Sequence, residues 1–284
     1  NFENFLEGDS NRLARSAGYA VSKRPGGTSF NPLLIFGGVG LGKTHLANAI
    51  GINVKQAFPE KTVLYISAEK FTQQYVDSVK KNNRNDFIHF YQLIDVLIID
   101  DVQFFSGKSG TQDVFFHIFN HLHQNGKQVV LTSDKAPVDM QEIEQRLLSR
   151  FKWGLSAELQ TPDYETRISI IKNKLARDGV EMEDDIIYYV AKHIKSNIRE
   201  LEGAIISLMA QSSFNKKQIT VDLAKVIVEK FVKNTKKEIS IDQIQKIVSD
   251  YFQMDVLTLQ SKTRKRHIVQ ARQLAMFFSK KFTK

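Results

Sequence analysis

The chain of 284 residues carries a net charge of +9, has no cysteine, and is 42% hydrophobic, which is ordinary for a globular protein. The absence of cysteine excludes disulfides, thiolate metal sites and a cysteine nucleophile. No stretch approaches the roughly 18 uncharged apolar residues of a membrane-spanning helix, and no signal peptide opens the sequence. We therefore expect a cytoplasmic protein of about two domains, with room for a third small one.

A glycine-rich turn between a strand and a helix is the first informative stretch along the chain. Residues 33–36 are apolar, and Gly37 to Thr44 then follow the spacing G-x-x-x-x-G-K-T. The glycines allow backbone N–H groups to turn toward a phosphate, and the helix N-terminus adds partial positive charge. Lys43 can reach the β- and γ-phosphates, and the Thr44 hydroxyl can bind Mg²⁺. This pattern predicts a nucleoside triphosphate site, with an ordinary glycine-rich turn as the alternative.

Two acidic residues follow a second apolar strand. Residues 94–99 are almost entirely apolar and lead directly into Asp100 and Asp101. In a parallel sheet the carboxyl ends of neighbouring strands lie beside the phosphate-binding loop. Asp100 can then bind the Mg²⁺ shell, while Asp101 orients or activates the attacking water. Acids that merely cap the next turn are the alternative, which the preceding phosphate-binding loop makes less attractive.

Strands and helices alternate through the first 160 residues. Apolar runs at 63–66, 129–133 and 153–156 predict three further strands, separated by segments with helical spacing. This alternation indicates βαβ units, in which a buried parallel sheet carries helices on both faces. We expect an α/β nucleotide-binding domain over residues 1–160.

The strand pattern ends at Thr161-Pro162, and only helical spacing follows. Apolar residues recur every three or four positions in four segments between residues 161 and 234. Asn197 and Glu200 form a candidate capping box at the start of the third segment. We expect an all-helical second domain over residues 161–234.

The C-terminal segment carries most of the net charge. Residues 235–284 have a net charge of +7, which leaves +2 for the rest, and no acid follows Val256. The basic cluster from Lys262 to His267 separates two predicted helices. A basic module on a near-neutral body favours a polyanionic partner, with a solvated basic tail as the alternative.

Three arginines are candidates for phosphate contacts. Arg146 and Arg150 lie four residues apart, so that both can point from the same face of a helix, and Arg199 lies at the start of a predicted helix beside Glu200. Spacing by itself favours surface ion pairs. The predicted phosphate site strengthens the functional interpretation, because a γ-phosphate binds a guanidinium well.

Several longer motifs together resemble one family. GGVGLGKTH, VLIIDDVQFF, LTSD, RLLSRFKWGL and NIRELEGA resemble the DnaA family of bacterial chromosomal replication initiators, which are AAA+ ATPases. ISIDQIQKIVSDYF followed by SKTRKR resembles the start of the family's origin-binding domain. The resemblance covers essentially all 284 residues. It implies an AAA+ P-loop sheet, a helical lid, and an incomplete helix-turn-helix domain over residues 235–284.

The resemblance also implies roles for individual residues. Asp100 and Asp101 take the Mg²⁺ and water roles, and Asp134 corresponds to sensor 1. Arg150 corresponds to the arginine finger that reaches the γ-phosphate of the next subunit, with Arg146 as its companion, and Arg199 corresponds to sensor 2. The residues that the resemblance places on ATP or ADP, besides Arg199, are Asp9, Ser10, Asn11, Gly38, Gly40, Leu41, Gly42, Lys43, Thr44 and His45.

A further set of residues is implied in DNA binding. Val76 and Lys108 fall on the surface that grips single-stranded DNA in this family, although Gly110 stands where a basic contact is expected. Arg266 aligns with a basic-loop arginine that touches the origin duplex. The basic loop contributes Lys262, Arg264, Lys265 and Arg266.

The expected function is therefore ATP-dependent initiation of bacterial chromosomal replication. ATP binding drives assembly of a homo-oligomer or filament on origin DNA and strand opening, and slow hydrolysis switches it off. The resemblance further implies a replicative helicase as partner, through an N-terminal domain that this chain lacks, and acidic phospholipid. Because the chain stops within the origin-binding domain, we expect it to have lost origin specificity while keeping salt-dependent phosphate contacts.

Two other functional classes remain open. An AAA+ helicase loader or an insertion-sequence ATP-binding protein shares the core, but does not need the basic segment 239–284. A DNA-binding module with a vestigial nucleotide site is the other alternative. The intact Lys43, Asp100 and Asp101 argue against it.

Overall fold

The computed structural model describes residues 1–215, 219–234, 241–261 and 263–282. It divides the chain into two compact units, Asn1–Phe231 and Val232–Lys284. No helix among the described residues is long and apolar enough to cross a membrane.

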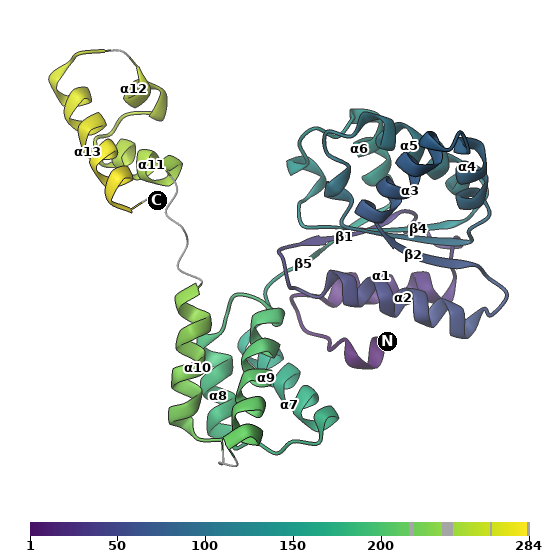
Figure 1. Cartoon of the computed structure of the whole chain (residues 1–284), viewed down its shortest axis with the longest axis horizontal. Helices are drawn as coiled ribbons and strands as arrows, with labels where there is room; N and C mark the ends of the chain where they lie inside the picture. Colours follow the sequence, from purple (N-terminus) through teal and green to yellow (C-terminus); the bar gives the residue numbers. More distant parts are fainter. Residues whose placement is uncertain (216–218, 235–240, 262, 283–284) are drawn as a thin grey trace. The chain divides into compact units, whose positions relative to one another are not determined.

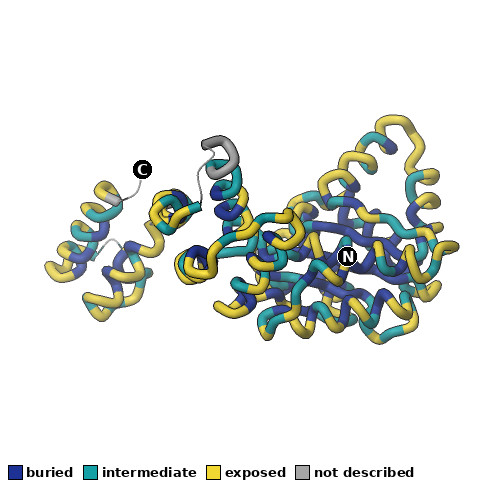
Figure 2. Tube along the Cα trace, turned by 90° about the horizontal axis from the view of Figure 1, so that it is seen from below, coloured by how far each residue is buried: buried dark blue, intermediate teal, exposed yellow. Residues whose placement is uncertain are grey.

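A parallel sheet forms the centre of the first unit (Figure 1). Among the described residues its strand order is β2-β3-β4-β1-β5, and every neighbouring pair is parallel. The central strands β1, β3 and β4 are almost entirely buried (Figure 2), as their β-branched and leucine-rich sequences predict for a sheet covered on both faces. The edge strands β2 and β5 are partly exposed. Their bounds are β1 Leu33–Gly37, β2 Val63–Ser67, β3 Val96–Asp100, β4 Gln128–Ser133 and β5 Leu155–Leu159.

Helices cover both faces of this sheet. On one face α1 and α2 pack on β1 around Leu46 and Ile50, and on the other Phe71 and Phe115 anchor α3 and α5. This arrangement confirms the predicted α/β class. The bounds are α1 Arg12–Lys23, α2 Lys43–Ala57, α3 Ala68–Lys80, α4 Arg84–Gln92, α5 Ser109–Gln124 and α6 Gln145–Phe151, with short 3₁₀ turns η1 Phe2–Asn4, η2 Val102–Phe105 and η3 Pro137–Asp139.

Two elements of the sheet region differ from the sequence pattern. The fifth strand begins at Leu155, two residues later than its apolar run. The reason is that Trp153 lies in a turn, where its N–H donates to the Arg150 carbonyl. The pattern does not predict α4, which begins inside a polar run. Later in α4 the side chains of Phe87 and Tyr91 contact the Phe71 ring and so attach this helix to the core.

The helical part of the first unit has a core of its own. Leu175, Val190, Leu208 and Ile227 are among the buried residues that hold its four described helices together. Half of the predicted capping box is present, since Glu200 N donates to Asn197 Oδ1 over 2.8 Å. The Glu200 carboxylate accepts from the side-chain Nδ2 of Asn197 (3.1 Å) in place of the Asn197 backbone N–H. We call this group the lid; its helices are α7 Tyr164–Asp178, α8 Asp184–His193, α9 Ile198–Asn215 and α10 Val221–Asn234.

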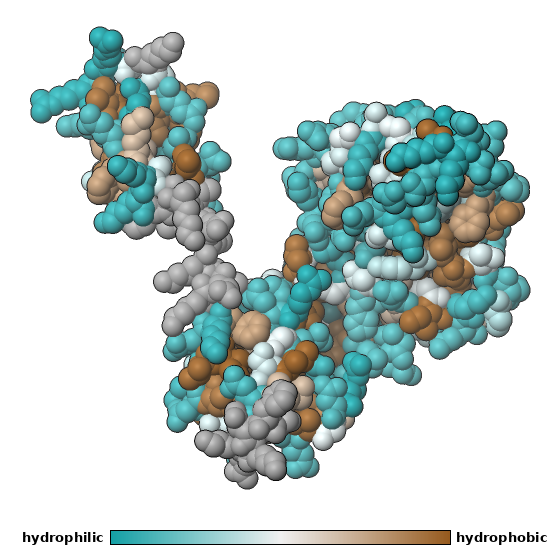
Figure 3. Space-filling model, viewed as in Figure 1, coloured by the Kyte–Doolittle hydropathy of each residue, from teal (hydrophilic) through white to brown (hydrophobic). Residues whose placement is uncertain are grey.

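The second unit contains three described helices around a small core of Ile244, Val248, Leu259 and Ala271. The last helix begins at Arg266, about three residues earlier than expected. Apolar residues such as Ile247 and Leu257 are exposed on this unit. Brown and teal surfaces are mixed on its visible face (Figure 3). A predicted cap at Ser240 lies outside the described residues. The bounds are α11 Ile241–Tyr251, α12 Val256–Gln260 and α13 Arg266–Phe282.

Candidate nucleotide-binding site

The glycine-rich turn connects β1 to α2 and touches the lid directly. Gly40 has a φ of +75°, which L-residues adopt only with strain. A Cβ at Gly40 would lie 2.8 Å from Asn197 Oδ1 and 3.1 Å from Arg199 Cβ. The Gly40 carbonyl accepts from the N–H groups of Ile198 (3.0 Å) and Arg199 (3.3 Å). Glycine at this position therefore lets the N-terminus of α9 dock on the loop.

Lys43 lies at the centre of the site with only 6% of its side chain exposed. Its Nζ donates to the carbonyls of Gly37 (2.9 Å) and Gly38 (2.8 Å). It also pairs with Asp134 Oδ1 at 2.6 Å. A buried ammonium needs such partners, and the carboxylate at the end of β4 supplies the opposite charge.

Asp100 ends β3 and is held by three hydroxyl groups. Its Oδ2 accepts from Thr44 Oγ1 at 2.9 Å and from Tyr65 Oη at 2.5 Å, and its Oδ1 accepts from Thr132 Oγ1. Burial and the hydrogen bond to Asp100 raise the pKa of Tyr65, so its phenol stays a donor. A fixed carboxylate beside the Thr44 hydroxyl fits Mg²⁺, which proteins bind through one or two carboxylates together with substrate phosphates.

Asp101 follows in a left-handed conformation with a φ of 60°, and its N–H donates to Thr132 Oγ1 over 2.9 Å. Burial raises the pKa of Asp101, with further contributions from the neighbouring carboxylates of Asp100 and Asp134. Gln103 donates from Nε2 to Asp101 Oδ1 (3.0 Å) and to Asp134 Oδ2 (3.2 Å). This glutamine connects two residues that the sequence predicts to be functional. The motif analysis did not assign it a role.

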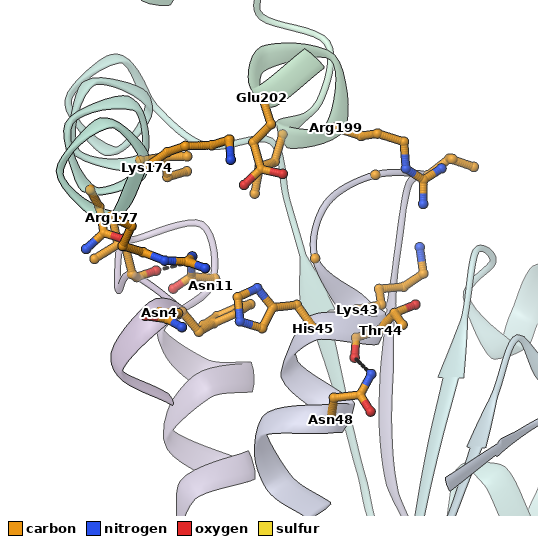
Figure 4. A pocket seen from close by; sticks show the side chains of 18 of the residues that line it. Asn4, Asn11, Lys43, Thr44, His45, Asn48, Lys174, Arg177, Arg199 and Glu202 are labelled. Atoms are coloured by element: carbon orange, nitrogen blue, oxygen red, sulfur yellow. Dashed lines mark hydrogen bonds between the residues drawn. The ribbon is translucent and has the colours of Figure 1, made fainter. Parts of the chain in front are cut away.

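A cavity of about 530 Å³ lies between the glycine-rich turn, the N-terminal segment and the lid. Lys174 and Arg177 on α7, and Arg199 and Glu202 on α9, face His45 and Lys43 across it (Figure 4). Among the described residues no cluster of three or more acidic, histidine or cysteine side chains could hold a metal without help from a ligand. The sequence-predicted residues that line the cavity are Asn11, Gly40, Gly42, Lys43, Thr44, His45, Asp101, Asp134 and Arg199.

Some predicted nucleotide contacts lie outside the cavity. Asp9 is exposed and pairs with Arg12 Nη2 at 2.7 Å, and the Ser10 carbonyl accepts from Gln160 N. The Leu41 side chain is buried in the core. Gly38 contributes its carbonyl to Lys43. Of the predicted N-terminal contacts, the structure brings Asn11 into the cavity and leaves Asp9 at the surface.

The motifs assigned no role to the other cavity residues. The ring of Phe5 meets His45 edge to face at 5.5 Å, and burial lowers the pKa of His45. Their positions depend on how the N-terminal segment and the lid pack, which local spacing does not encode. The additional lining residues are Asn4, Phe5, Leu6, Val39, Asn48, Ile170, Asn173, Lys174, Arg177, Ile198 and Glu202.

The arginines fall into different environments. Arg199 lines the cavity, whereas Arg146 and Arg150 do not. Arg146 forms surface ion pairs with Glu144 (2.6 Å) and Asp113 (2.9 Å). Arg150 pairs with no carboxylate among the described residues, and its Nε donates to Asn120 Oδ1 over 2.8 Å. The ion-pair alternative therefore describes Arg146 and not Arg150.

The residues predicted to contact DNA are exposed or partly exposed where the structure describes them. Val76 on α3 is 39% exposed, and Lys108 Nζ lies 5.8 Å from the centroid of the Phe104 ring just before α5. A Cβ at Gly110 would meet the Tyr75 ring at 3.6 Å, which is ordinary contact. Arg264, Lys265 and Arg266 are exposed at the start of α13, and Lys262 lies outside the described residues.

A family model described as "Bacterial DnaA ATPAse domain" matches residues 1–158, which is more than half of the chain. The chain belongs to the bacterial DnaA family. A second model, "Bacterial dnaA protein helix-turn-helix", matches residues 241–284. The resemblance inferred from the motifs is confirmed, as is a DnaA-type helix-turn-helix region at the C-terminal end.

Named relatives agree with this assignment. The chain is 82% identical over 283 residues to "Chromosomal replication initiator protein DnaA" of Flavobacterium psychrophilum and 53% identical to that of Bacteroides thetaiotaomicron. All of this chain is covered, against 59% and 60% of those relatives, so the chain spans about three fifths of their length.

Solved structures give the same family. Domain III of the Thermotoga maritima DnaA protein superposes with a TM-score of 0.79 at 44% identity, covering 82% of this chain and 97% of that one. AMPPCP-bound DnaA from Aquifex aeolicus superposes with a TM-score of 0.71 at 36% identity, covering 99% and 82%. A further DnaA structure with the same scores is bound to AMPPCP and single-stranded DNA.

Proposed function

We propose that this chain carries the ATP-dependent switch of a bacterial chromosomal replication initiator. The observation that carries the proposal is the contact of Gly40 with Asn197 and Arg199, which makes the phosphate-binding loop and the lid two walls of one cavity. A triphosphate bound there contacts both walls, so its terminal phosphate can set the position of the lid. The relative from Aquifex aeolicus that binds the ATP analogue AMPPCP supports this assignment.

In the proposed mechanism the chain's own residues each do one task. The loop N–H groups and Lys43 bind the phosphates. Thr44 and Asp100 would hold Mg²⁺, which would offset phosphate charge when bound. Asp101 orients the attacking water. Asp134 and Arg199 read the γ-phosphate from the end of β4 and from the lid. The outcome is slow hydrolysis of ATP to ADP and phosphate, with Arg150 supplied by a neighbouring copy.

We propose that DNA is the other ligand. The related DnaA structure bound to single-stranded DNA supports a single-stranded ligand. The family resemblance places this ligand at Val76 and Lys108. The basic residues Arg264 to Arg266 favour salt-dependent contacts with duplex phosphates. The proposed protein is cytoplasmic and has a nucleotide-binding domain over residues 1–160, a helical lid over 161–234 and a DNA-binding domain over 235–284. Contacts with a replicative helicase and with acidic phospholipid rest on the family resemblance.

Sedimentation velocity in ATP and in ADP tests the switch. We expect larger assemblies in ATP than in ADP, and a Lys43→Ala variant that binds a fluorescent ATP analogue weakly and does not assemble. Equal assembly in both nucleotides would contradict the switch. Helicase loaders are the competing class, and the helices α11–α13 with their basic loop favour the initiator, because a loader does not need that unit.

A further inference from the structure

Arg150 is held by neutral groups near the end of α6. Its Nε donates to Asn120 Oδ1 over 2.8 Å. Its guanidinium carbon lies 4.6 Å from the centroid of the Trp153 ring and 5.5 Å from that of Phe116. No carboxylate pairs with Arg150 among the described residues, so the positive charge on this side chain is not neutralised locally.

Arg146, one helical turn earlier, provides a direct contrast. Its guanidinium carbon also lies over Phe116, at 4.8 Å. Both Nε and Nη2 of Arg146 are bound by carboxylates, those of Glu144 and Asp113. A phosphate approaching Arg146 would have to displace these acids. A phosphate approaching Arg150 would meet a cation whose partners carry no charge.

The groups around Arg150 are anchored to the core of the unit. Trp153 stacks on His123 at 4.5 Å, and His123 stacks on Phe119 at 6.0 Å with nearly parallel rings. Phe119 is fully buried in the core that covers one face of the sheet. Asn120 and Phe116 lie on the same helix, α5, as these rings. The position of the guanidinium is thereby tied to the sheet.

These contacts involve the guanidinium carbon and Nε of Arg150, and not its two terminal Nη groups. The guanidinium carbon lies over the rings of Trp153 and Phe116, and Nε donates to Asn120. The two terminal Nη groups have no hydrogen-bond partner among the described residues. Two adjacent N–H donors on a planar cation match two oxygens of a phosphate, and this is the geometry in which arginine outperforms lysine. Fixing the side chain beforehand also reduces the entropy lost on binding.

We propose that Trp153, Phe116 and Asn120 are positioning residues that present the Nη groups of Arg150 to the terminal phosphate of a nucleotide held by a second copy of this chain. The proposal rests on the proposed function, because it assumes that Arg150 acts on a neighbouring site. It assigns the exposed ring of Trp153, 54% accessible, to the surface on which that second copy docks.

The test measures ATP-dependent assembly by sedimentation velocity for Arg150→Ala, Trp153→Ala, Trp153→Phe and Arg146→Ala. We expect Trp153→Ala to assemble at about five- to tenfold higher protein concentration, since a cation–π contact and preorganisation are lost. Trp153→Phe should recover part of this loss, because it keeps an aromatic face. Arg146→Ala removes the neighbouring arginine, whose guanidinium is already paired with Glu144 and Asp113, and should impair assembly less than Arg150→Ala.

A second readout reports the contact itself. Trp153 is the single tryptophan of the sequence, so its fluorescence reports this position. We expect Arg150→Ala to change the emission of the unassembled chain, and ATP-driven assembly to change that of the parent but not of Arg150→Ala. Binding of a fluorescent ATP analogue and the melting temperature of Trp153→Ala show whether this variant is folded.

The outcomes separate the two proposals. If Arg150→Ala fails to assemble while folded Trp153→Ala assembles like the parent, the positioning role is refuted and the proposed function stands. If Arg150→Ala itself assembles like the parent in ATP, the action of Arg150 on a second copy is refuted. If Trp153→Phe assembles no better than Trp153→Ala, the aromatic contact with Arg150 is not what the tryptophan contributes.

Discussion

Gln103 and Asp134 are hydrogen-bonded to each other in both directions. Asp134 N donates to Gln103 Oε1 over 3.2 Å, and Gln103 Nε2 donates to Asp134 Oδ2 over 3.2 Å. The same Nε2 reaches Asp101 Oδ1 at 3.0 Å. One amide thus fixes the separation of two carboxylates that repel each other, one at the end of β3 and one at the end of β4.

We expect Gln103→Glu to lower ATP hydrolysis about tenfold to a hundredfold, because a carboxylate cannot donate to Asp101 or Asp134 and misplaces both. ATP affinity should change less, since Gln103 does not line the cavity. Steady-state kcat together with binding of a fluorescent ATP analogue checks this. Glutamate has nearly the shape of glutamine, so a Gln103→Glu variant with the parent's kcat would show that Gln103 only fills space.

Tyr65 offers a prediction about Mg²⁺. Its phenol donates to Asp100 Oδ2 at 2.5 Å, beside the Thr44 hydroxyl. In Tyr65→Phe the carboxylate loses one of three hydroxyl donors that hold it, and groups of this kind typically change metal affinity or activity by about 10- to 100-fold. We expect hydrolysis to need more Mg²⁺, measured as the concentration for half-maximal rate. Tyr19→Phe, which removes a phenol on α1, is the control and should keep the parent's Mg²⁺ dependence.

The close approach of the lid to the loop predicts the effect of Gly40→Ala. The new Cβ would meet Asn197 Oδ1 at 2.8 Å and Arg199 Cβ at 3.1 Å, so α9 must move away. We expect weaker ATP binding and a lower melting temperature. Gly126→Ala separates the effect of the clash with the lid from the effect of backbone strain. Gly126 has a similar φ of +67°, but no atom lies within 4 Å of the added Cβ.

The control variant, Gly126→Ala, should lose about 1 kcal/mol of folding stability through backbone strain and keep the parent's ATP affinity. Isothermal calorimetry with ATP and thermal melts distinguish the two variants. Equal loss of ATP binding in Gly126→Ala and Gly40→Ala would mean that strain in the chain, and not contact with the lid, determines affinity.

Much of this site could be predicted locally, because its central residues follow strands at fixed spacing. The parallel sheet brings the loop that follows β1 close to the ends of β3 and β4, so that Thr44 donates to Asp100 and Lys43 pairs with Asp134. The role of Gln103 could not be predicted, because an amide side chain three residues after β3 matches no known functional pattern. Its role appears only when β3 and β4 are adjacent.

The cavity walls were harder to predict for another reason. Lys174 and Arg177 lie on a helix whose spacing indicates a buried face and an exposed one, and nothing local shows that its exposed residues line the cavity. That depends on the docking of α9 at Gly40. Asp9 shows the converse, since a polar residue expected at the nucleotide instead pairs with Arg12 at the surface.

Asp163 gives a prediction about pH. It caps α7, which carries Lys174 and Arg177, by accepting from Thr166 N at 2.7 Å, and this hydrogen bond lowers the pKa of Asp163. A lowered pKa means that the carboxylate stabilises the folded chain at pH values above the ordinary aspartate pKa, and that this stabilisation is lost as the pH falls through the lowered value. Urea midpoints of the parent and Asp163→Ala should therefore differ at pH 7 and draw together only as the pH falls below about 4, toward the lowered pKa. A constant difference across this range would contradict the role of the charge.

Substitutions of Arg199 and Arg150 are expected to have different effects, because Arg199 lines the cavity of its own chain and Arg150 does not. Arg199→Ala should weaken ATP discrimination or hydrolysis within a single chain, at concentrations too low for assembly. Arg150→Ala should keep nearly the parent's ATP affinity there, and lose assembly and hydrolysis at high concentration. Mixing supplies the control: Arg150→Ala chains have intact cavities, so adding Lys43→Ala chains, which keep Arg150, should restore hydrolysis. Loss of ATP binding by isolated Arg150→Ala chains would instead place that arginine at its own nucleotide.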